Sequence, residues 1–290
     1  MFAKGPSHST ALGPGCAGPP LANPQNFGQA GPGAHEHGSH QPSCGAAPFA
    51  VDASMLRSAG SQPHKHTQSP YVTGSSVLGI TYAGGVMLAS DTLASYGSTK
   101  RYKSVQRLVK VNETTVLGAG GEISDLQYIL NMLDDLSTED YCADDGQSLS
   151  SQELYSYLSR VMYNRRNKMD PLWNSLLIAG LESGKPFLGS VNMIGVAFSD
   201  DHLATGFGSH LARPLFRKKH RPDMSEEEAT ALIREALEVC YYRDKQSINK
   251  FQIAKVTTAG GVSISDAFAL PTKWEYQAFV DPTRDAVGVW

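Results

Sequence analysis

The sequence pairs a hydroxyl with a carboxylate at the two ends of a predicted β-hairpin. Two apolar runs, Ser76–Tyr82 and Val86–Ala89, flank Ala83–Gly85. A Gly-Gly turn between runs of small and β-branched residues is typical of a hairpin. A hairpin that returns at Asp91 brings this carboxylate near Ser75, sixteen positions earlier in the chain. A serine hydroxyl can attack a carbonyl carbon when a base takes its proton, so Ser75 is the candidate nucleophile.

Two other patterns suggest a metal or a cofactor, and neither is favoured. Five histidines could form a metal-binding tract, but a low-complexity tail that happens to be rich in histidine is the simpler interpretation: His35, His37, His40, His64 and His66. Gly206–Gly208 (GFG) resembles the start of a dinucleotide fingerprint. It lacks the third glycine, and no βαβ pattern surrounds it. We therefore expect no metal and no cofactor.

Composition limits the class of protein. The chain has 290 residues and a formal net charge of −3, which favours neither nucleic-acid nor membrane-surface binding. No apolar run approaches the roughly 18–20 residues that span a bilayer, and the first residues do not resemble a secretory signal. The cysteines are scattered and form no CxxC pair: Cys16, Cys44, Cys142 and Cys240. Reduced thiols and a soluble intracellular protein are expected.

Residues 1–66 differ from the rest of the chain. They contain ten glycines, nine prolines and six of the nine histidines, but only five charged side chains. Such a segment buries too little apolar surface to offset the entropy lost on ordering, so we expect it to be disordered. The composition changes over residues 64–74, so the folded domain is expected to begin near there.

The remaining pattern predicts strands and helices in alternating groups. Helices are expected over about 123–136, 150–167, 209–217 and 225–242; two of them open with a capping box, at Ser150 with Glu153 and at Ser225 with Glu228. Strands are expected at 105–111, 115–118, 176–180, 187–191, 194–198, 250–257 and 262–265. Gly118–Gly121 is expected to let the backbone bend before the first helix. Periodicity alone justifies only a mixed α and β fold.

Several short motifs together carry a resemblance to a known family: Gly74–Gly79 (GSSVLG), Gly85–Asp91 (GVMLASD), Gly118–Gly121 (GAGG) and Tyr241–Asp244 (YYRD). These residues resemble proteasome β subunits, which are N-terminal-nucleophile hydrolases. Asn164–Asn174 and Tyr242–Gln252 resemble in particular the non-catalytic branch at the seventh position of the eukaryotic β ring. The resemblance covers about residues 67–276 and implies an α+β fold, a four-layer αββα sandwich of two antiparallel sheets flanked by helices.

The resemblance also implies which residues occupy the catalytic positions. An active subunit uses a free amino-terminal Thr, an Asp, a Lys, a loop Ser and a late Asp/Ser pair. At those positions this chain has Ser75, Asp91, Arg107, Phe207, Asp244 and Ser247. Arginine stays protonated above pH 12 and cannot share a proton as lysine does, and a phenyl ring has no hydroxyl. We therefore expect vestigial positions and no catalytic residue. Asp91 is expected to close the hairpin and to pair with Arg107, while Asp244 and Ser247 cap the long helix.

Maturation and assembly follow from the same resemblance. Residues 1–66 would be a propeptide, removed by cleavage between His66 and Thr67, so that Ser75 stays inside the chain without a free amine. The chain would join other α and β subunits in a 28-subunit 20S core particle in the cytoplasm and nucleus. Residues 277–290 form a predicted arm that reaches the opposite β ring. The aromatic side chains of the tail from Lys273 onward are expected to anchor it: Trp274, Tyr276, Phe279 and Trp290.

Two alternatives remain open at this point. Cleavage between Gly74 and Ser75 would free a seryl amino terminus and give an active threonine- or serine-type endopeptidase. A homo-oligomeric shell or binding protein outside the eukaryotic proteasome is the other. The first residue of the mature chain separates an active from an inactive subunit, and heteromeric partners would exclude the homo-oligomer.

Overall fold

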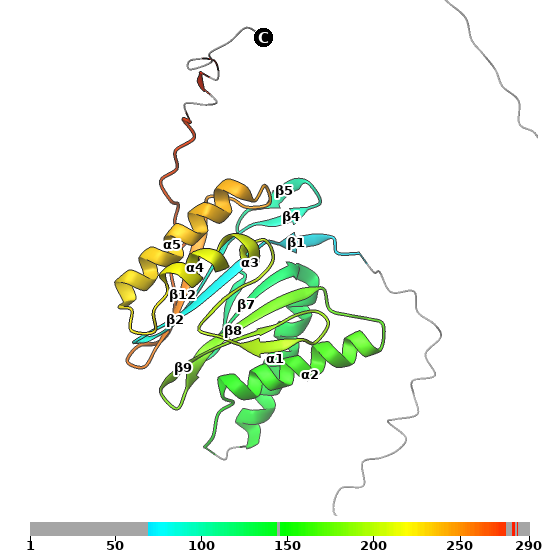
Figure 1. Ribbon diagram of the computed structural model, residues 1–290. Coiled ribbons are helices and arrows are strands. Elements are labelled where there is room, and N and C mark those ends of the chain that lie inside the picture. The colour runs from blue at the N-terminus through cyan, green and yellow to red at the C-terminus, as the bar shows by residue number, and fades with distance from the viewer. Residues whose placement is uncertain (1–68, 144–145, 277–279, 282, 284–290) are drawn as a thin grey trace, which may run out of the picture. The chain divides into compact units, whose positions relative to one another are not determined.

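Two antiparallel β-sheets lie face to face, with helices on both outer faces (Figure 1). The computed structural model describes residues 69–143, 146–276, 280–281 and 283, which all belong to the compact unit Pro63–Trp290. The predicted disordered segment 1–66, its cleavage site at His66 and Thr67, and most of the predicted arm 277–290 lie outside the described residues.

The smaller sheet has the predicted hairpin near its centre, in the strand order β11-β2-β3-β12-β13. Its strands are β2 (Val77–Tyr82), β3 (Gly85–Asp91), β11 (His202–Ala204), β12 (Phe251–Thr257) and β13 (Gly261–Ile264). Every residue of β2 and β3 is buried. This hairpin is covered on both faces, so its sequence is continuously apolar rather than alternating.

The larger sheet has eight strands in the order β10-β9-β8-β7-β1-β4-β5, and β6 also pairs with β7. Its strands are β1 (Val72–Gly74), β4 (Ala94–Tyr96), β5 (Thr99–Tyr102), β6 (Leu108–Asn112), β7 (Thr115–Glu122), β8 (Asn174–Glu182), β9 (Lys185–Val191) and β10 (Ala197–Ser199). The run β8-β9-β10 confirms the predicted meander.

Three apolar cores separate the four layers. Side chains of α1 (Ile123–Ala143) and α2 (Ser151–Asn167) pack on the outer face of the larger sheet. The smaller sheet packs against α3 (Gly208–Leu211), α4 (Arg213–Lys219) and α5 (Glu226–Arg243). Between the sheets, Val77 and Leu88 meet Val116 and Leu177. The predicted αββα sandwich is therefore confirmed.

Both predicted capping boxes are present. Ser150 Oγ accepts from Glu153 N–H at 3.2 Å, and Glu153 accepts from Ser150 N–H at 2.8 Å. Ser225 and Glu228 repeat the pair at 3.2 and 3.0 Å. Each box satisfies two backbone donors that a helix otherwise leaves unpaired at its start.

The structure corrects several predicted boundaries. The expected bend at Gly118–Gly121 is part of β7, which continues to Glu122; a side chain at Gly120 would come 2.7 Å from Ser75 O, so the glycine allows close approach. The expected helix over 209–217 is two short helices, with proline near the start of α4. β10 begins at Ala197 rather than Ile194, because Asn192 Oδ1 accepts from the backbone of the intervening turn.

Four strands were not predicted: β1, β4, β5 and β11. Each has only three or four residues, which is too short for a period-2 pattern to stand out. The four residues of β5 are exposed throughout. Two of these strands also pair with partners that are distant in the sequence: β11 pairs with β2, and β1 pairs with β7.

Candidate active site

Ser75 lies where the chain leaves the larger sheet and enters the smaller one. β1 ends at Gly74 and β2 begins at Val77, so Ser75 and Ser76 link the two sheets. Gly74 is paired with Ala94 of β4 on one side and with Gly121 of β7 on the other. The nitrogen of Ser75 is therefore an amide nitrogen that follows a strand held on both sides. Amide resonance leaves it no basic lone pair.

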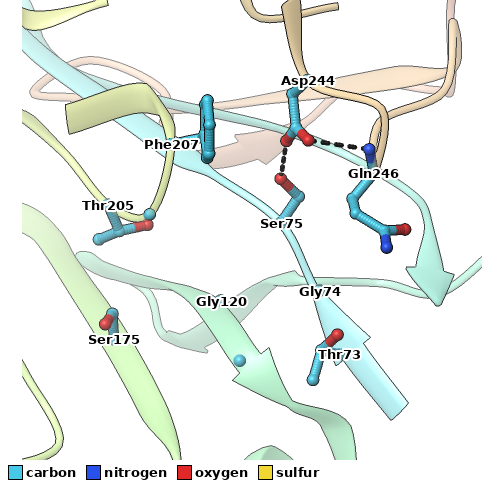
Figure 2. Close-up of a pocket in the computed structure, with 11 residues that line it drawn as sticks. Thr73, Gly74, Ser75, Gly120, Ser175, Thr205, Phe207, Asp244 and Gln246 are labelled. Atoms are coloured by element: carbon cyan, nitrogen blue, oxygen red, sulfur yellow. Dashed lines mark hydrogen bonds between the residues drawn. The ribbon is translucent and has the colours of Figure 1, made fainter. Parts of the chain in front are cut away.

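The Ser75 hydroxyl faces the loop that follows α5. Its Oγ donates a hydrogen bond to Asp244 Oδ2, and the other carboxylate oxygen accepts from Gln246 N–H at 2.8 Å (Figure 2). Asp244 is the C-cap residue of α5. Within the described part of the chain, no hydrogen bond joins Ser75 directly to Asp91. A third side chain connects the two residues by donating hydrogen bonds to both of them.

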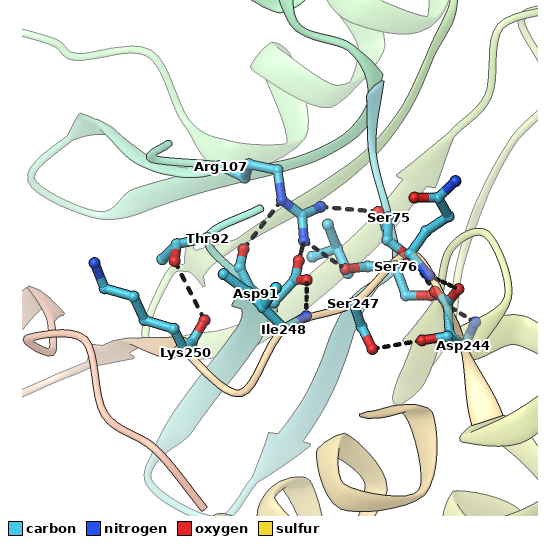
Figure 3. Close-up of polar contacts among 12 residues, drawn as sticks. Ser75, Ser76, Asp91, Thr92, Arg107, Asp244, Ser247, Ile248 and Lys250 are labelled. Atoms are coloured by element: carbon cyan, nitrogen blue, oxygen red, sulfur yellow. Dashed lines mark hydrogen bonds and ion pairs between the residues drawn. The ribbon is translucent and has the colours of Figure 1, made fainter. Parts of the chain in front are cut away.

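That third side chain is Arg107, which has an exposed fraction of 0%. Its Nε donates to Asp91 O at 3.1 Å, and Nη1 donates to Ser75 O at 2.8 Å and to Ala119 O at 3.2 Å. Nη2 donates to Ser76 O at 3.2 Å and to Asp91 Oδ1 (Figure 3). A guanidinium has five N–H donors, and five contacts use them. Arg107 thus joins the link between the sheets to the end of β3 and to the middle of β7.

The predicted ion pair between Arg107 and Asp91 is confirmed, and it is fully rather than partly buried. Arg107 precedes β6, whereas the sequence pattern placed it within that strand. Gly74 makes room for it, since a Cβ at this position would come 2.5 Å from Arg107 Cδ. Burial raises the pKa of Asp91, while Arg107 and the Ile248 N–H at 3.1 Å partly oppose this rise.

The loop that precedes α3 is joined to the start of β2 by two hydroxyl groups that the sequence did not single out, one from the loop and one from the link between the sheets. Phe207 is 56% exposed and has no hydroxyl to offer. Thr205 Oγ1 instead accepts from Val77 N–H at 3.0 Å, and Ser76 Oγ accepts from Gly208 N–H at 2.8 Å. Both hydroxyls connect this loop to the start of β2. A lone Ser or Thr beside a glycine-rich loop carries no periodic signal, so the sequence could not reveal this role.

Ser247 caps the end of α5, as predicted. Its Oγ donates to Asp244 O at 2.7 Å, and the amide of Ser247 donates to the same oxygen at 3.3 Å. Its own carbonyl accepts from Lys100 Nζ at 2.7 Å. This hydroxyl is directed to the helix end, where it satisfies a carbonyl group that the helix leaves unpaired.

A cavity of about 330 Å³ lies beside Ser75 (Figure 2). Its described lining residues are Thr73, Gly74, Ser75, Gly120, Gly121, Ser175, Thr205, Gly206, Phe207, Asp244 and Gln246. None of them is a lysine or a histidine. The carboxylate of Asp244 is the one ionisable group in that lining, and a carboxylate without an adjacent imidazole or amine is a weak general base near neutral pH.

The part of the chain that the structure describes contains neither a cluster of metal ligands nor a helix that could span a membrane. No three His, Cys, Asp or Glu side chains gather there in a way that could hold a metal ion. The predicted histidine tract lies outside the described residues. Every helix in the same part is too short or too polar to span a membrane.

Comparisons with known proteins point to one family. A family model described as "Proteasome subunit" matches residues 71–256. Proteasome subunit beta type-4 of Arabidopsis thaliana is 50% identical over 226 residues, 78% of this chain and 92% of the relative. The protein of the same name from Xenopus laevis is 44% identical, over 74% of this chain and 90% of the relative. Proteasome subunit beta type-7 of Saccharomyces cerevisiae is 40% identical, over 77% and 88%. The chain belongs to the proteasome subunit family.

Proposed function

We propose that this chain is a non-catalytic structural and assembly subunit of the 20S proteasome core particle, which degrades proteins in an ATP- and ubiquitin-dependent manner as a complex. The observation that carries this proposal is the position of Ser75 within the chain, after β1 of one sheet and before β2 of the other. In N-terminal-nucleophile hydrolases the α-amine of the nucleophile is the base. Here that nitrogen is part of a peptide bond.

The surroundings of Ser75 support the same conclusion. General acid–base assistance contributes about 10²–10⁴-fold to a reaction, and the groups that would give it are missing together. An arginine side chain does not give up its proton as a lysine can, and the N–H groups of Arg107 are used by backbone oxygens and Asp91. The retained polar residues keep a structural role, because buried polar groups must keep their hydrogen bonds.

Maturation is part of the proposal. An endopeptidase cleaves between His66 and Thr67, and residues 1–66 are removed from the working subunit. Thr67 then becomes the first residue, eight positions before Ser75. Pro70 restricts the intervening backbone, so Thr67 itself does not reach the position of the nucleophile.

The partners are other α and β proteasome subunits in a 28-subunit core, in the cytoplasm and nucleus. Residues 277–290 act as an arm toward the opposite β ring. The arm leaves from a fixed base, which supports this role: Asn249 and Leu270 exchange two hydrogen bonds at 2.7 and 2.8 Å. Trp274 then packs edge-on against Tyr242, with ring centroids 4.9 Å apart.

An electrophilic peptide inhibitor of threonine proteases tests the proposal on assembled particles. We expect mass spectrometry to find Thr67 as the first residue and no adduct on Ser75, while catalytic subunits of the same particle react and serve as the internal control. A covalent adduct on Ser75, or a mature chain that begins at Ser75, would instead establish an active endopeptidase. Recovery of this chain without heteromeric partners would support the homo-oligomeric shell.

A further inference from the structure

β1 is an interior strand of the larger sheet and pairs on both sides with strands that come later in the sequence. On one side Val72 pairs with Tyr96 and Thr73 with Ser95 of β4. On the other side Thr73 pairs with Glu122 of β7. Figure 1 shows β1 beside β4, on the side of that strand that faces β7. The segment before Ser75 therefore occupies a position that a separate extended peptide could otherwise take by strand addition.

The backbone pairing of β1 with β7 includes Thr73 and Gly74 but no residue before Thr73. β7 ends at Glu122 and α1 begins at the next residue, so the ladder on this side stops there. The Glu122 side chain continues it: Oε2 accepts from Tyr71 N–H and from Val72 N–H, the latter at 3.0 Å. Oε1 accepts from Ser124 Oγ at 3.0 Å.

Glu122 is well placed for this contact. Its exposed fraction is 7%, and hydrogen bonds from backbone N–H groups to a carboxylate are about twice as strong as those between neutral groups. Its backbone is also fixed on both sides, since its N–H donates to Trp173 O at 2.9 Å and its carbonyl accepts from Asn174 Nδ2 at 2.8 Å. The carboxylate is thus a rigid acceptor for two donors that would otherwise lack a strand partner.

We propose that Glu122 is a positioning residue that latches residues 71–74 between β4 and β7 and so limits how far the amino-terminal segment can be trimmed. The inference rests on the proposed cleavage before Thr67. Trimming is hydrolysis by an endopeptidase: water adds across the His66–Thr67 bond, which leaves a carboxylate on His66 and an amine on Thr67. A protease needs several residues in an extended, unpaired state, and the latched strand does not provide them.

The position of the cleavage site fits this limit. Residues 71–74 are paired or latched, and Pro70 has no N–H and a fixed φ. The held segment therefore begins at Tyr71, four positions after Thr67. Without the latch, the start of β1 would be held through β4 alone, and trimming would extend past Pro70.

Mass spectrometry of the amino terminus in purified, assembled particles tests the latch. With Glu122→Ala we expect the fraction of chains that begin downstream of Pro70 to rise at least tenfold. Glu122→Gln keeps an amide oxygen that can accept both N–H groups, so its first residue should match the wild type. Ser124→Ala is the matched control, because it removes a neighbouring hydrogen bond to Glu122 and leaves both latch contacts.

A second pair of variants keeps the test independent of the stability of the domain. Tyr71→Pro removes one latched N–H from an exposed position, whereas Tyr71→Ala keeps that N–H and loses the ring contact with Tyr96 at 5.6 Å. We expect extended trimming only for the proline variant. An unchanged first residue in Glu122→Ala and Tyr71→Pro particles would overturn the latch. That result would leave the proposed function intact, since the proposed function fails only if wild-type Ser75 reacts with the electrophile.

Discussion

Arg107 is the residue that most clearly gives this site a structural role. A lysine offers three donors and can lose a proton when it is buried, whereas arginine offers five and does not. In this chain five acceptors surround the guanidinium, and four of them are backbone oxygens, those of Ser75, Ser76, Asp91 and Ala119. A side chain that fixes so much backbone is suited to hold two sheets together rather than to transfer a proton.

Replacing Arg107 by Met should therefore lower the stability of the subunit without changing peptide hydrolysis by the assembly. Removal of one partner from a buried ion pair costs about 3–5 kcal/mol, because the other charge stays buried. Denaturant unfolding of the purified chain measures this loss. Lys110→Met is the control, since it breaks an exposed pair with Glu113 that is worth only about 0–1 kcal/mol. An Arg107→Met chain as stable as the control would contradict the assignment.

The cysteines give a second prediction at this scale. Burial, with smaller effects from the nearby Asp244 and Asp91 carboxylates, raises the pKa of Cys240 to about 12. The thiolate is the reactive form, so almost none is present at pH 8. We expect iodoacetamide to alkylate the exposed Cys142 in the native chain and to leave Cys240 unmodified until the chain is unfolded. Peptide mapping measures both sites, and equal labelling of the two in the folded chain would show that α5 is not packed as described.

At the scale of elements, the site depends on how closely β7 approaches the link between the sheets. A Cβ at Gly120 would come 2.7 Å from Ser75 O, and a backbone atom cannot move aside as the end of a side chain can. Gly120→Ala should therefore displace the link, weaken the Arg107 contacts and destabilise the chain by about 1–3 kcal/mol, the usual cost of overpacking. Gly260→Ala is the control, since its nearest neighbour is a side-chain hydroxyl at 3.0 Å. Equal midpoints of unfolding for the two variants would contradict this prediction.

The same elements show how much of the fold the sequence could predict. Long periodic helices and the continuous apolar hairpin were predicted because their signals are local: the stripes of α1 and α5, and the caps at Ser150 and Ser225. The latch at Glu122 could not be predicted, because a single glutamate before a helix usually reads as a favourable charge in the first turn. Its partners are fifty residues away in the chain, and only the pairing of β1 with β7 brings them together.

The candidate site divides in the same way. Resemblance to a family placed Ser75, Asp91, Arg107, Asp244 and Ser247 at positions that the structure brings together. It did not indicate that the Ser75 hydroxyl would donate its hydrogen bond to Asp244 rather than to Asp91. That choice depends on how the loop after α5 packs against the link between the sheets, which no local pattern encodes.

At the scale of the whole molecule, the carboxyl-terminal part of the chain has a fixed base and exposed aromatic side chains. Trp274 and Tyr276 are 55% and 50% exposed, although Trp274 contacts Tyr241 and Tyr242. A cavity of about 740 Å³ is lined by Trp274 and Tyr276 together with three residues of α5: Val239, Tyr242 and Arg243. Large aromatic side chains left exposed on a short segment are typical of interface anchors, and this supports the proposed arm that begins at residue 277.

Deletion of residues 277–290 should therefore reduce the yield of double-ring particles and leave the subunit folded, because the anchored segment up to Tyr276 remains. A loss of two anchors of about 2 kcal/mol each would weaken the ring–ring contact roughly 10²–10³-fold. Native mass spectrometry measures full and half particles. Phe279→Ala with Trp290→Ala keeps the length of the arm and tests whether the aromatic groups carry the effect. An unchanged yield of full particles after the deletion would show that the rings associate through other surfaces, and the arm would then have no role in joining them.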